Sequence, residues 1–218
     1  MLNAELARRQ MIDQQIRAWD VLDARVLDAM SLVRREAFVP QSHREMAFAD
    51  MAVPLPHGQA MLPPKLEGRI LQALAALPGD RALEIGTGSG HFAACLGRLT
   101  ASVRSVEIVP ELARTAAERL FEQGAYNVTV ETGDGMRLAG PEGGFEVIAL
   151  TGSLPVYDAR FERLLAEGGR LFAIVGSGPM MEARLITRVG PEEWLHESLF
   201  ETSAPPLVHA PEAPRFVF

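Results

Sequence analysis

The chain has 218 residues, of which 48% are hydrophobic and 22% charged, and these values are ordinary for one globular domain. Its formal net charge of −7 disfavours nucleic-acid binding, because nucleic-acid-binding domains usually carry a basic face. No segment approaches the ~20 apolar residues of a membrane span, and the N-terminus lacks the apolar core of a signal peptide. The single cysteine, Cys95, excludes an internal disulfide, so we expect a cytoplasmic protein. No cluster of histidines and cysteines has metal-ligand spacing, so we predict no metal site.

The first third of the chain is predicted to be largely helical. Apolar spacing predicts helices over residues 2–18 and 66–77. A second helix is predicted over residues 24–32, and residues 42–48 are expected to form one more short turn of helix. Asp20 or Asp23 suits the N-cap of the helix over residues 24–32. The neighbouring pair Arg34 and Arg35 is interpreted as solvated surface charge.

Residues 50–65 interrupt this pattern with four prolines and one glycine. Proline disfavours both a regular helix and a central strand, so we expect an irregular segment here. The segment is either a linker or a lid that folds over a ligand. Its methionines and leucines favour a packed loop over a mobile one.

The stretch over residues 82–90 reads Ala-Leu-Glu-Ile-Gly-Thr-Gly-Ser-Gly. It predicts a strand, a tight glycine turn and the start of a helix, whose free N–H groups favour a ligand. Glu84 precedes the first glycine by two residues, which suits a ligand with a cationic or hydroxyl-bearing end. S-adenosylmethionine has an ammonium group and no phosphate. A nicotinamide dinucleotide and a purely structural turn are the alternatives.

Strands and helices alternate from this stretch onward, which predicts a parallel sheet with helices on both faces. Glu107 ends the second strand about 20 residues beyond the glycines, the usual place for a carboxylate that binds ribose hydroxyls. Two consecutive strands near the C-terminus suggest an antiparallel pair at the sheet edge. The predicted strands are 81–85, 102–107, 127–131, 145–150, 170–175, 184–189 and 194–201, and the predicted helices are 90–98, 110–123 and 157–166.

These residues resemble the protein-L-isoaspartate O-methyltransferases over nearly the whole chain. The resemblance is carried by residues 83–90, by Glu107 after Val106, by Gly-Asp-Gly at 133–135 and by residues 145–148 with Thr151. Upstream, residues 33–40 and 52–59 are similar to segments that precede the family's core. The resemblance implies a Rossmann-like class I methyltransferase fold, with a mainly parallel seven-stranded sheet, helices on both faces and an N-terminal helical extension.

The resemblance also implies a division of the chain and a cofactor site. Residues 1–80 would form the helical region and substrate loop, and residues 81–218 would bind S-adenosylmethionine, with S-adenosylhomocysteine as product. Glu107 would hold the ribose hydroxyls from the surface side, and Asp134 would meet the adenine amino group. The implied cofactor residues are Glu84, Gly86, Thr87, Gly88, Ser89, Gly90, Glu107, Ile108, Asp134, Gly135 and Thr151.

The sequence departs from the family in the substrate loop, Gly58-Gln59-Ala60-Met61-Leu62. Ala60 and Leu62 stand where the family has a threonine and its active-site serine, so no hydroxyl is left to bond a substrate carboxylate. The catalytic residue is therefore unassigned. His57 is a candidate base if the acceptor carries a proton, and is otherwise a solvent-exposed loop histidine.

Three functions remain open at this point. The first is methyl transfer to a carboxylate of a protein or peptide, which needs in-line positioning and no general base. The second is transfer to a less polar acceptor, and the third is a paralogue that binds the cofactor without catalysis. We expect a monomer or homodimer.

Overall fold

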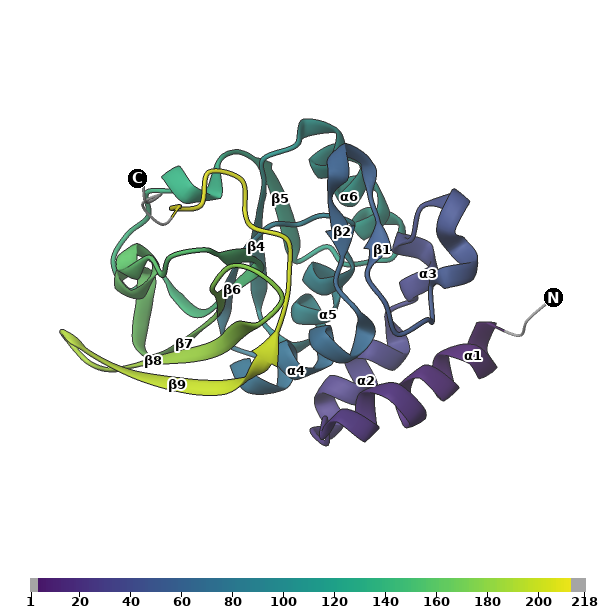
Figure 1. Ribbon diagram of the computed structural model, residues 1–218, viewed down its shortest axis with the longest axis horizontal. Coiled ribbons are helices and arrows are strands. Elements are labelled where there is room, and N and C mark those ends of the chain that lie inside the picture. Colours follow the sequence, from purple (N-terminus) through teal and green to yellow (C-terminus); the bar gives the residue numbers. More distant parts are fainter. Residues whose placement is uncertain (1–3, 213–218) are drawn as a thin grey trace, which may run out of the picture.

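The computed structural model describes residues 4–212, and its centre is a seven-stranded sheet of order β5-β4-β3-β6-β7-β8-β9 (Figure 1). Strands β5 to β7 are parallel, while β8 is antiparallel to both of its neighbours. The predicted mainly parallel sheet and its antiparallel terminal pair are confirmed. The strands are β3 Arg81–Ile85, β4 Ser102–Glu107, β5 Val128–Thr132, β6 Phe145–Leu154, β7 Leu165–Val175, β8 Met181–Gly190 and β9 Glu193–Thr202.

The strand order reverses direction beside β3. From β3 the chain moves outward through β4 to β5, and then returns to place β6 on the other side of β3. Ligands of open parallel sheets bind at such a switch point, outside the carboxyl ends of the strands. The ends of β3, β4 and β6 are therefore where a binding site is expected.

Helical segments cover the two faces of the sheet unequally. One face packs inward-facing residues such as Val103 and Val147 against the α-helices α4 Pro64–Leu74, α5 His91–Leu99 and α6 Pro110–Glu122. Within residues 4–212, the other face lies under two 3₁₀ helices, η5 Gly135–Arg137 and η6 Ala159–Leu164.

The helix predicted over residues 157–166 is wrong in type and length, since η6 is a 3₁₀ helix of six residues. Asp158 caps it at one end, and at the other Leu165 already pairs with Phe145 of β6. The two glycines at 168–169, which follow the predicted helix, lie inside β7. Strand pairing has overridden the local helical pattern.

The N-terminal helices pack on the same face as α4 and α5. Asp23 caps α2 by accepting a hydrogen bond from the Arg25 backbone, as predicted. Met11, Met30 and Phe38 share one buried core with residues of the sheet, so that core is continuous across residue 80. The segments are α1 Ala4–Met11, η1 Ile12–Ile16, η2 Arg17–Trp19, α2 Ala24–Leu32, α3 Arg35–Phe38 and η3 Gln41–Met46.

The proline-rich segment 50–65 is packed, as predicted, and contains a small hairpin that was not predicted. β1 Val53–Pro54 pairs antiparallel with β2 Ala60–Met61 around the turn η4 Pro56–Gly58. Leu55 and Leu62 are buried beside it. The hairpin is short because Pro54 and the prolines that follow β2 cannot extend a ladder.

After β9 the chain runs back across the ends of the central strands (Figure 1). The Ser153 N–H donates to the Pro205 carbonyl at 2.8 Å, and the Leu207 N–H donates to the Ser153 carbonyl at 2.9 Å. These bonds hold residues 204–208 against the end of β6. Of the helices in the part of the chain that the structure describes, none is long and apolar enough to cross a membrane.

Candidate active site

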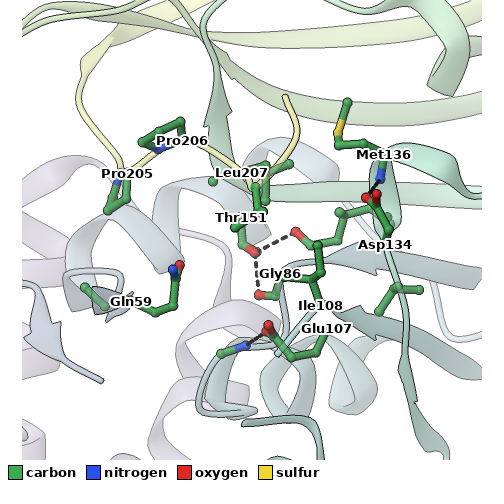
Figure 2. A pocket seen from close by; sticks show the side chains of 17 residues that line it. Gln59, Gly86, Glu107, Ile108, Asp134, Met136, Thr151, Pro205, Pro206 and Leu207 are labelled. Carbon is green, nitrogen blue, oxygen red and sulfur yellow. Dashed lines mark hydrogen bonds between the residues drawn. The ribbon is translucent and has the colours of Figure 1, made fainter. Parts of the chain in front are cut away.

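A cavity of about 70 Å³ lies at the switch point, above the ends of β3, β4 and β6 (Figure 2). Its walls come from the substrate loop, the glycine turn, the strand ends and the C-terminal segment. The lining residues are Gln59, Ala60, Ile85, Gly86, Gly88, Val106, Glu107, Ile108, Asp134, Gly135, Met136, Thr151, Gly152, Pro205, Pro206, Leu207 and Val208.

A second, smaller cavity of about 30 Å³ adjoins the first and shares Ala60, Gly86, Gly88 and Thr151 with it. Its other lining residues are Met61, Leu62, Glu67, Glu84, Thr87, Ser89 and Phe92. Together the two cavities bring together every predicted cofactor residue except Gly90.

The glycine turn has the backbone that its sequence predicts. Gly86, Gly88 and Gly90 all have positive φ, which side chains disfavour. A Cβ on Gly86 would lie 2.6 Å from the Thr151 hydroxyl, so this turn also needs the space that glycine leaves. Gly90 has a different role: its Cα faces Ala116 of α6, where a Cβ would approach to 3.3 Å, so it permits close helix packing.

Glu84 lies fully buried at the end of β3. One carboxylate oxygen, Oε2, accepts a hydrogen bond from the Ser105 hydroxyl, while Oε1 has no partner among the described residues. Burial raises the pKa of Glu84 to about 8, and the nearby carboxylates of Glu107 and Glu67 add to this rise. An unpartnered buried carboxylate beside a cavity fits a cationic group, such as the ammonium of S-adenosylmethionine.

Glu107 is held by the backbone around it. Its carboxylate accepts the N–H of Gly88 at 2.8 Å and the N–H of Val109 at 2.9 Å. The expected position on the surface side is wrong, because the residue is only 5% exposed. Each carboxylate oxygen has a further lone pair, so ribose hydroxyls can still donate to this fixed group.

Asp134 lines the larger cavity and lies on the far side of Thr151 from Gln59 in the view of Figure 2. It accepts the Met136 N–H at 2.9 Å, and its other oxygen lies 2.8 Å from Nδ1 of His209. Burial alone would raise the pKa of Asp134, but the hydrogen bonds from His209 and Met136 and the charges of His209 and Arg137 lower it overall. The C-terminal segment that supplies His209 also supplies residues 205–208 of the cavity wall.

The substrate loop contributes to both cavities, but not with all of its residues. Gln59 and Ala60 line the larger cavity, and Met61 and Leu62 line the smaller one. Gly58 lines neither. His57 also lies outside, since its Nε2 is 2.8 Å from the Glu111 carboxylate on the exposed surface. The candidate base is therefore directed away from the site.

A buried charged cluster behind the smaller cavity was not predicted. Arg35, interpreted from the sequence as surface charge, is fully buried. It donates to the carbonyls of Ala47 at 3.0 Å and Leu62 at 2.7 Å, and forms an ion pair with Glu67. Nδ1 of His91 lies 2.8 Å from the same Glu67 carboxylate. The cluster therefore joins the substrate loop to the first turns of α4 and α5.

The charge balance in this cluster favours an ionised Glu67. Burial by itself raises the pKa of Glu67, but the charges of Arg35 and His91 outweigh it and lower the pKa overall. The sequence signal for the cluster was weak, because Arg34 and Arg35 are identical in type and only the second points inward. Cys95 is a buried free thiol.

A mainly parallel sheet with a glycine turn and acidic strand ends at its switch point is the architecture of Rossmann-like folds. The S-adenosylmethionine-dependent methyltransferases are one class of these folds. The family model for protein-L-isoaspartate(D-aspartate) O-methyltransferase matches residues 6–208. The chain belongs to this family and is an S-adenosylmethionine-dependent O-methyltransferase.

Individual relatives agree with this assignment. A protein-L-isoaspartate O-methyltransferase of Koribacter versatilis is 39% identical over 84% of this chain and 82% of its own. A second such enzyme, from Pelobacter propionicus, is 39% identical over 95% of this chain and 93% of its own. The fold is shared with a Plasmodium falciparum protein described as the same enzyme and solved with S-adenosylhomocysteine. That structure has a TM-score of 0.78 and 19% identity over 92% of this chain and 97% of its own.

Proposed function

We propose that the protein methylates the free carboxylate of isoaspartyl residues in polypeptides. The observation that carries this proposal is the family match over residues 6–208, which includes the substrate loop as well as the cofactor core. The same match does not favour a less polar acceptor or a paralogue without catalysis. We therefore interpret the absence of hydroxyls at Ala60 and Leu62 as a change in how the acceptor is held, and not as a change of substrate.

The residues that would bind the different parts of the cofactor are distributed along the two cavities. Glu84 would hold the ammonium group of the cofactor, Glu107 its ribose hydroxyls and Asp134 its adenine amino group. Once bound, S-adenosylmethionine would supply an electrophilic methyl group, whose carbon bonds to the acceptor oxygen as the bond to sulfur breaks and S-adenosylhomocysteine leaves. The role of the protein is to align the acceptor with that methyl group and to exclude water.

No group on the chain has to remove a proton from this acceptor. A free carboxylate is ionised at neutral pH, since carboxyl pKa values lie near 4. The outward direction of His57 is therefore compatible with activity. With Ala60 and Leu62 in the loop, the acceptor has to be oriented by backbone groups, by Gln59 and by the shape of the cavity.

The proposal is tested with labelled S-adenosylmethionine and two peptides of one sequence, containing an isoaspartyl or a normal aspartyl residue. A base-labile methyl ester is expected on the isoaspartyl peptide alone. Equal labelling of both peptides, or labelling of neither, would contradict the proposed substrate. The Glu84→Gln variant serves as the control for cofactor-dependent labelling.

Replacing Glu107 with alanine is expected to weaken S-adenosylhomocysteine binding by about 10- to 150-fold, because hydrogen bonds to a charged group contribute roughly 1.5–3 kcal/mol. Glutamine should give an intermediate affinity. The alanine variant should also lose about 1–3 kcal/mol of stability, since two backbone N–H groups lose their acceptor. Calorimetry and thermal melts measure both effects, with Glu111→Ala as a surface control. Unchanged affinity would mean that the ribose lies elsewhere.

We further propose that the protein acts in the cytoplasm, on damaged proteins, and that it does not bind nucleic acid. The net charge of −7 and the free thiol of Cys95 support these predictions. Size-exclusion chromatography would determine whether the chain is a monomer or a homodimer. Within residues 4–212 no group of three or more metal-ligating side chains is arranged around a common point.

A further inference from the structure

Residues 53–62 contain the β1–β2 hairpin and the substrate loop, and two hydrogen bonds join them to the rest of the described chain. The ladder and the turn use bonds that are internal to this segment. One external bond links His57 to Glu111 at the exposed surface, where such pairs contribute little. The other is buried, and Nη2 of Arg35 donates it to the Leu62 carbonyl at 2.7 Å. The buried polar attachment of the loop is therefore made by one arginine.

Arg35 contacts both sides of the junction between β2 and α4. The Leu62 carbonyl lies before this junction, and Glu67, the ion-pair partner of Arg35, lies after it in the first turn of α4. Nε of the same guanidinium donates to the Ala47 carbonyl at 3.0 Å. A guanidinium is planar and its donors form a rigid fork, so three acceptors around it are held in one relative arrangement. Arg35 therefore sets the direction in which the loop leaves α4.

The partner of Arg35 is itself held from a third element. Nδ1 of His91, at the start of α5, lies 2.8 Å from the Glu67 carboxylate oxygen that also pairs with Arg35. An ionised carboxylate only accepts hydrogen bonds, so Nδ1 carries the proton that it donates. The attachment of the loop is thus part of a buried network that joins the first turns of α3, α4 and α5, and such networks are rigid when their members are paired.

The atoms that this network holds lie beside the proposed site. Leu62 and Glu67 line the smaller cavity, and Ala60 lines both cavities. Pro63 disfavours a helical backbone at Leu62, so the junction is stiff and a displacement at Leu62 is passed along β2 to Ala60. Burial of the Leu62 side chain does not prevent such a displacement, because apolar contacts are non-directional.

We infer that Arg35 is a positioning residue for methyl transfer. Through the Leu62 carbonyl it fixes the substrate loop relative to the cofactor, so that the acceptor carboxylate meets the methyl group in line. Arg35 lines neither cavity, and it therefore acts through the loop without touching cofactor or acceptor. This inference rests on the proposed function, because it takes the loop to orient the acceptor.

The first test replaces Arg35 with lysine, which keeps a positive charge beside Glu67 but cannot also bond two carbonyls in different directions. The kcat for an isoaspartyl peptide is expected to fall about 100-fold, because a displacement of about 1 Å at a reacting group can cost that much. The affinity for S-adenosylhomocysteine, measured by calorimetry, should change little. Arg119→Lys is the matched control, since Arg119 donates to the carbonyl of Phe38, also on α3, and has no hydrogen bond to the loop. Its kcat should equal that of wild type.

The double variant Arg35→Met with Glu67→Met separates positioning from folding. Apolar residues in place of a buried ion pair often restore stability, whereas the bond to the Leu62 carbonyl stays lost. At saturating S-adenosylmethionine we expect this variant to keep a low kcat although it is more stable than Arg35→Met. Recovery of kcat together with stability would mean that Arg35 only supports the fold, and would overturn the inference. The double variant takes the place of Arg35→Lys in every assay if the lysine variant does not fold.

Hydrogen exchange of the ligand-free protein separates this inference from the proposed function, because it needs no substrate. Backbone amides of residues 59–62 should exchange faster in Arg35→Lys than in wild type, while those of β3 keep their rates. Faster loop exchange in Arg35→Lys, with no methyl ester formed by wild type, would support the role of Arg35 and overturn the proposed substrate. An active wild type whose kcat is unchanged by Arg35→Lys would overturn the inference and leave the proposed function standing. Unchanged loop exchange would overturn the inference in either case.

Discussion

Replacing Glu84 with glutamine is expected to stabilise the ligand-free protein and to destroy its affinity for the cofactor. The carboxyl group has a pKa of about 8 in the folded chain, against an ordinary value of 4.5. Between these two pH values the unfolded chain releases a proton that the folded chain keeps. Wild-type stability therefore falls as the pH rises from 4.5 to 8, and levels off above.

At pH 7 this effect lowers the free energy of unfolding of the wild type by about 3 kcal/mol. A neutral glutamine at this position does not incur that loss. The variant should therefore be more stable than wild type by up to that amount in denaturant melts at pH 7, and the gap should narrow toward pH 5. Its affinity for S-adenosylhomocysteine should fall by at least about 100-fold, because the ammonium group loses its buried counter-charge. A stability gap that does not change between pH 5 and 8 would contradict the assigned pKa.

Replacing Arg35 with methionine is expected to cost about 3–5 kcal/mol of stability, because Glu67 is left ionised and buried without its main partner. The backbone carbonyls of Leu62 and Ala47 also lose their donor. Denaturant melts measure the loss. The neighbouring Arg34, whose side chain is 63% exposed, provides a matched control, and Arg34→Met should stay within about 0.5 kcal/mol of wild type.

The double variant Arg35→Met with Glu67→Met tests the origin of that loss. Apolar residues in place of a buried ion pair often restore stability, so the double variant should be more stable than Arg35→Met alone. If the double variant is less stable than the single one, Glu67 is not the source of the penalty.

The sheet was predictable, and so was the convergence of the candidate residues on one cavity, because the signals for both are local. Each strand end carries its own chemistry, so the glycine turn after Glu84, the carboxylate of Glu107 and the Gly-Asp-Gly around Asp134 can be found separately in the sequence. Parallel pairing then brings them to one edge, as Figure 2 shows. Hydrophobic periodicity sufficed for α2, whose bounds agree with the prediction.

The features that were missed depend on contacts between distant segments. Arg35 and Glu67 are 32 positions apart, and nothing local tells the buried arginine from its exposed neighbour. The helix predicted before β7 failed because strand pairing with β6 begins at Leu165. The proline-punctuated C-terminal segment carries no motif, although it forms one side of the cavity.

If the cavity holds the cofactor as proposed, this C-terminal segment determines when the protein becomes able to bind its cofactor during synthesis. The glycine turn and the acidic strand ends leave the ribosome first, and residues 205–208, which form a wall of the cavity, emerge only after β9 is made. A nascent chain arrested within β9 has most of the sheet and an incomplete binding site. We therefore expect chains elongated beyond Leu207 to retain the cofactor and chains released earlier to lose it. Protease cleavage that removes residues 205–208 should have the same effect as early release.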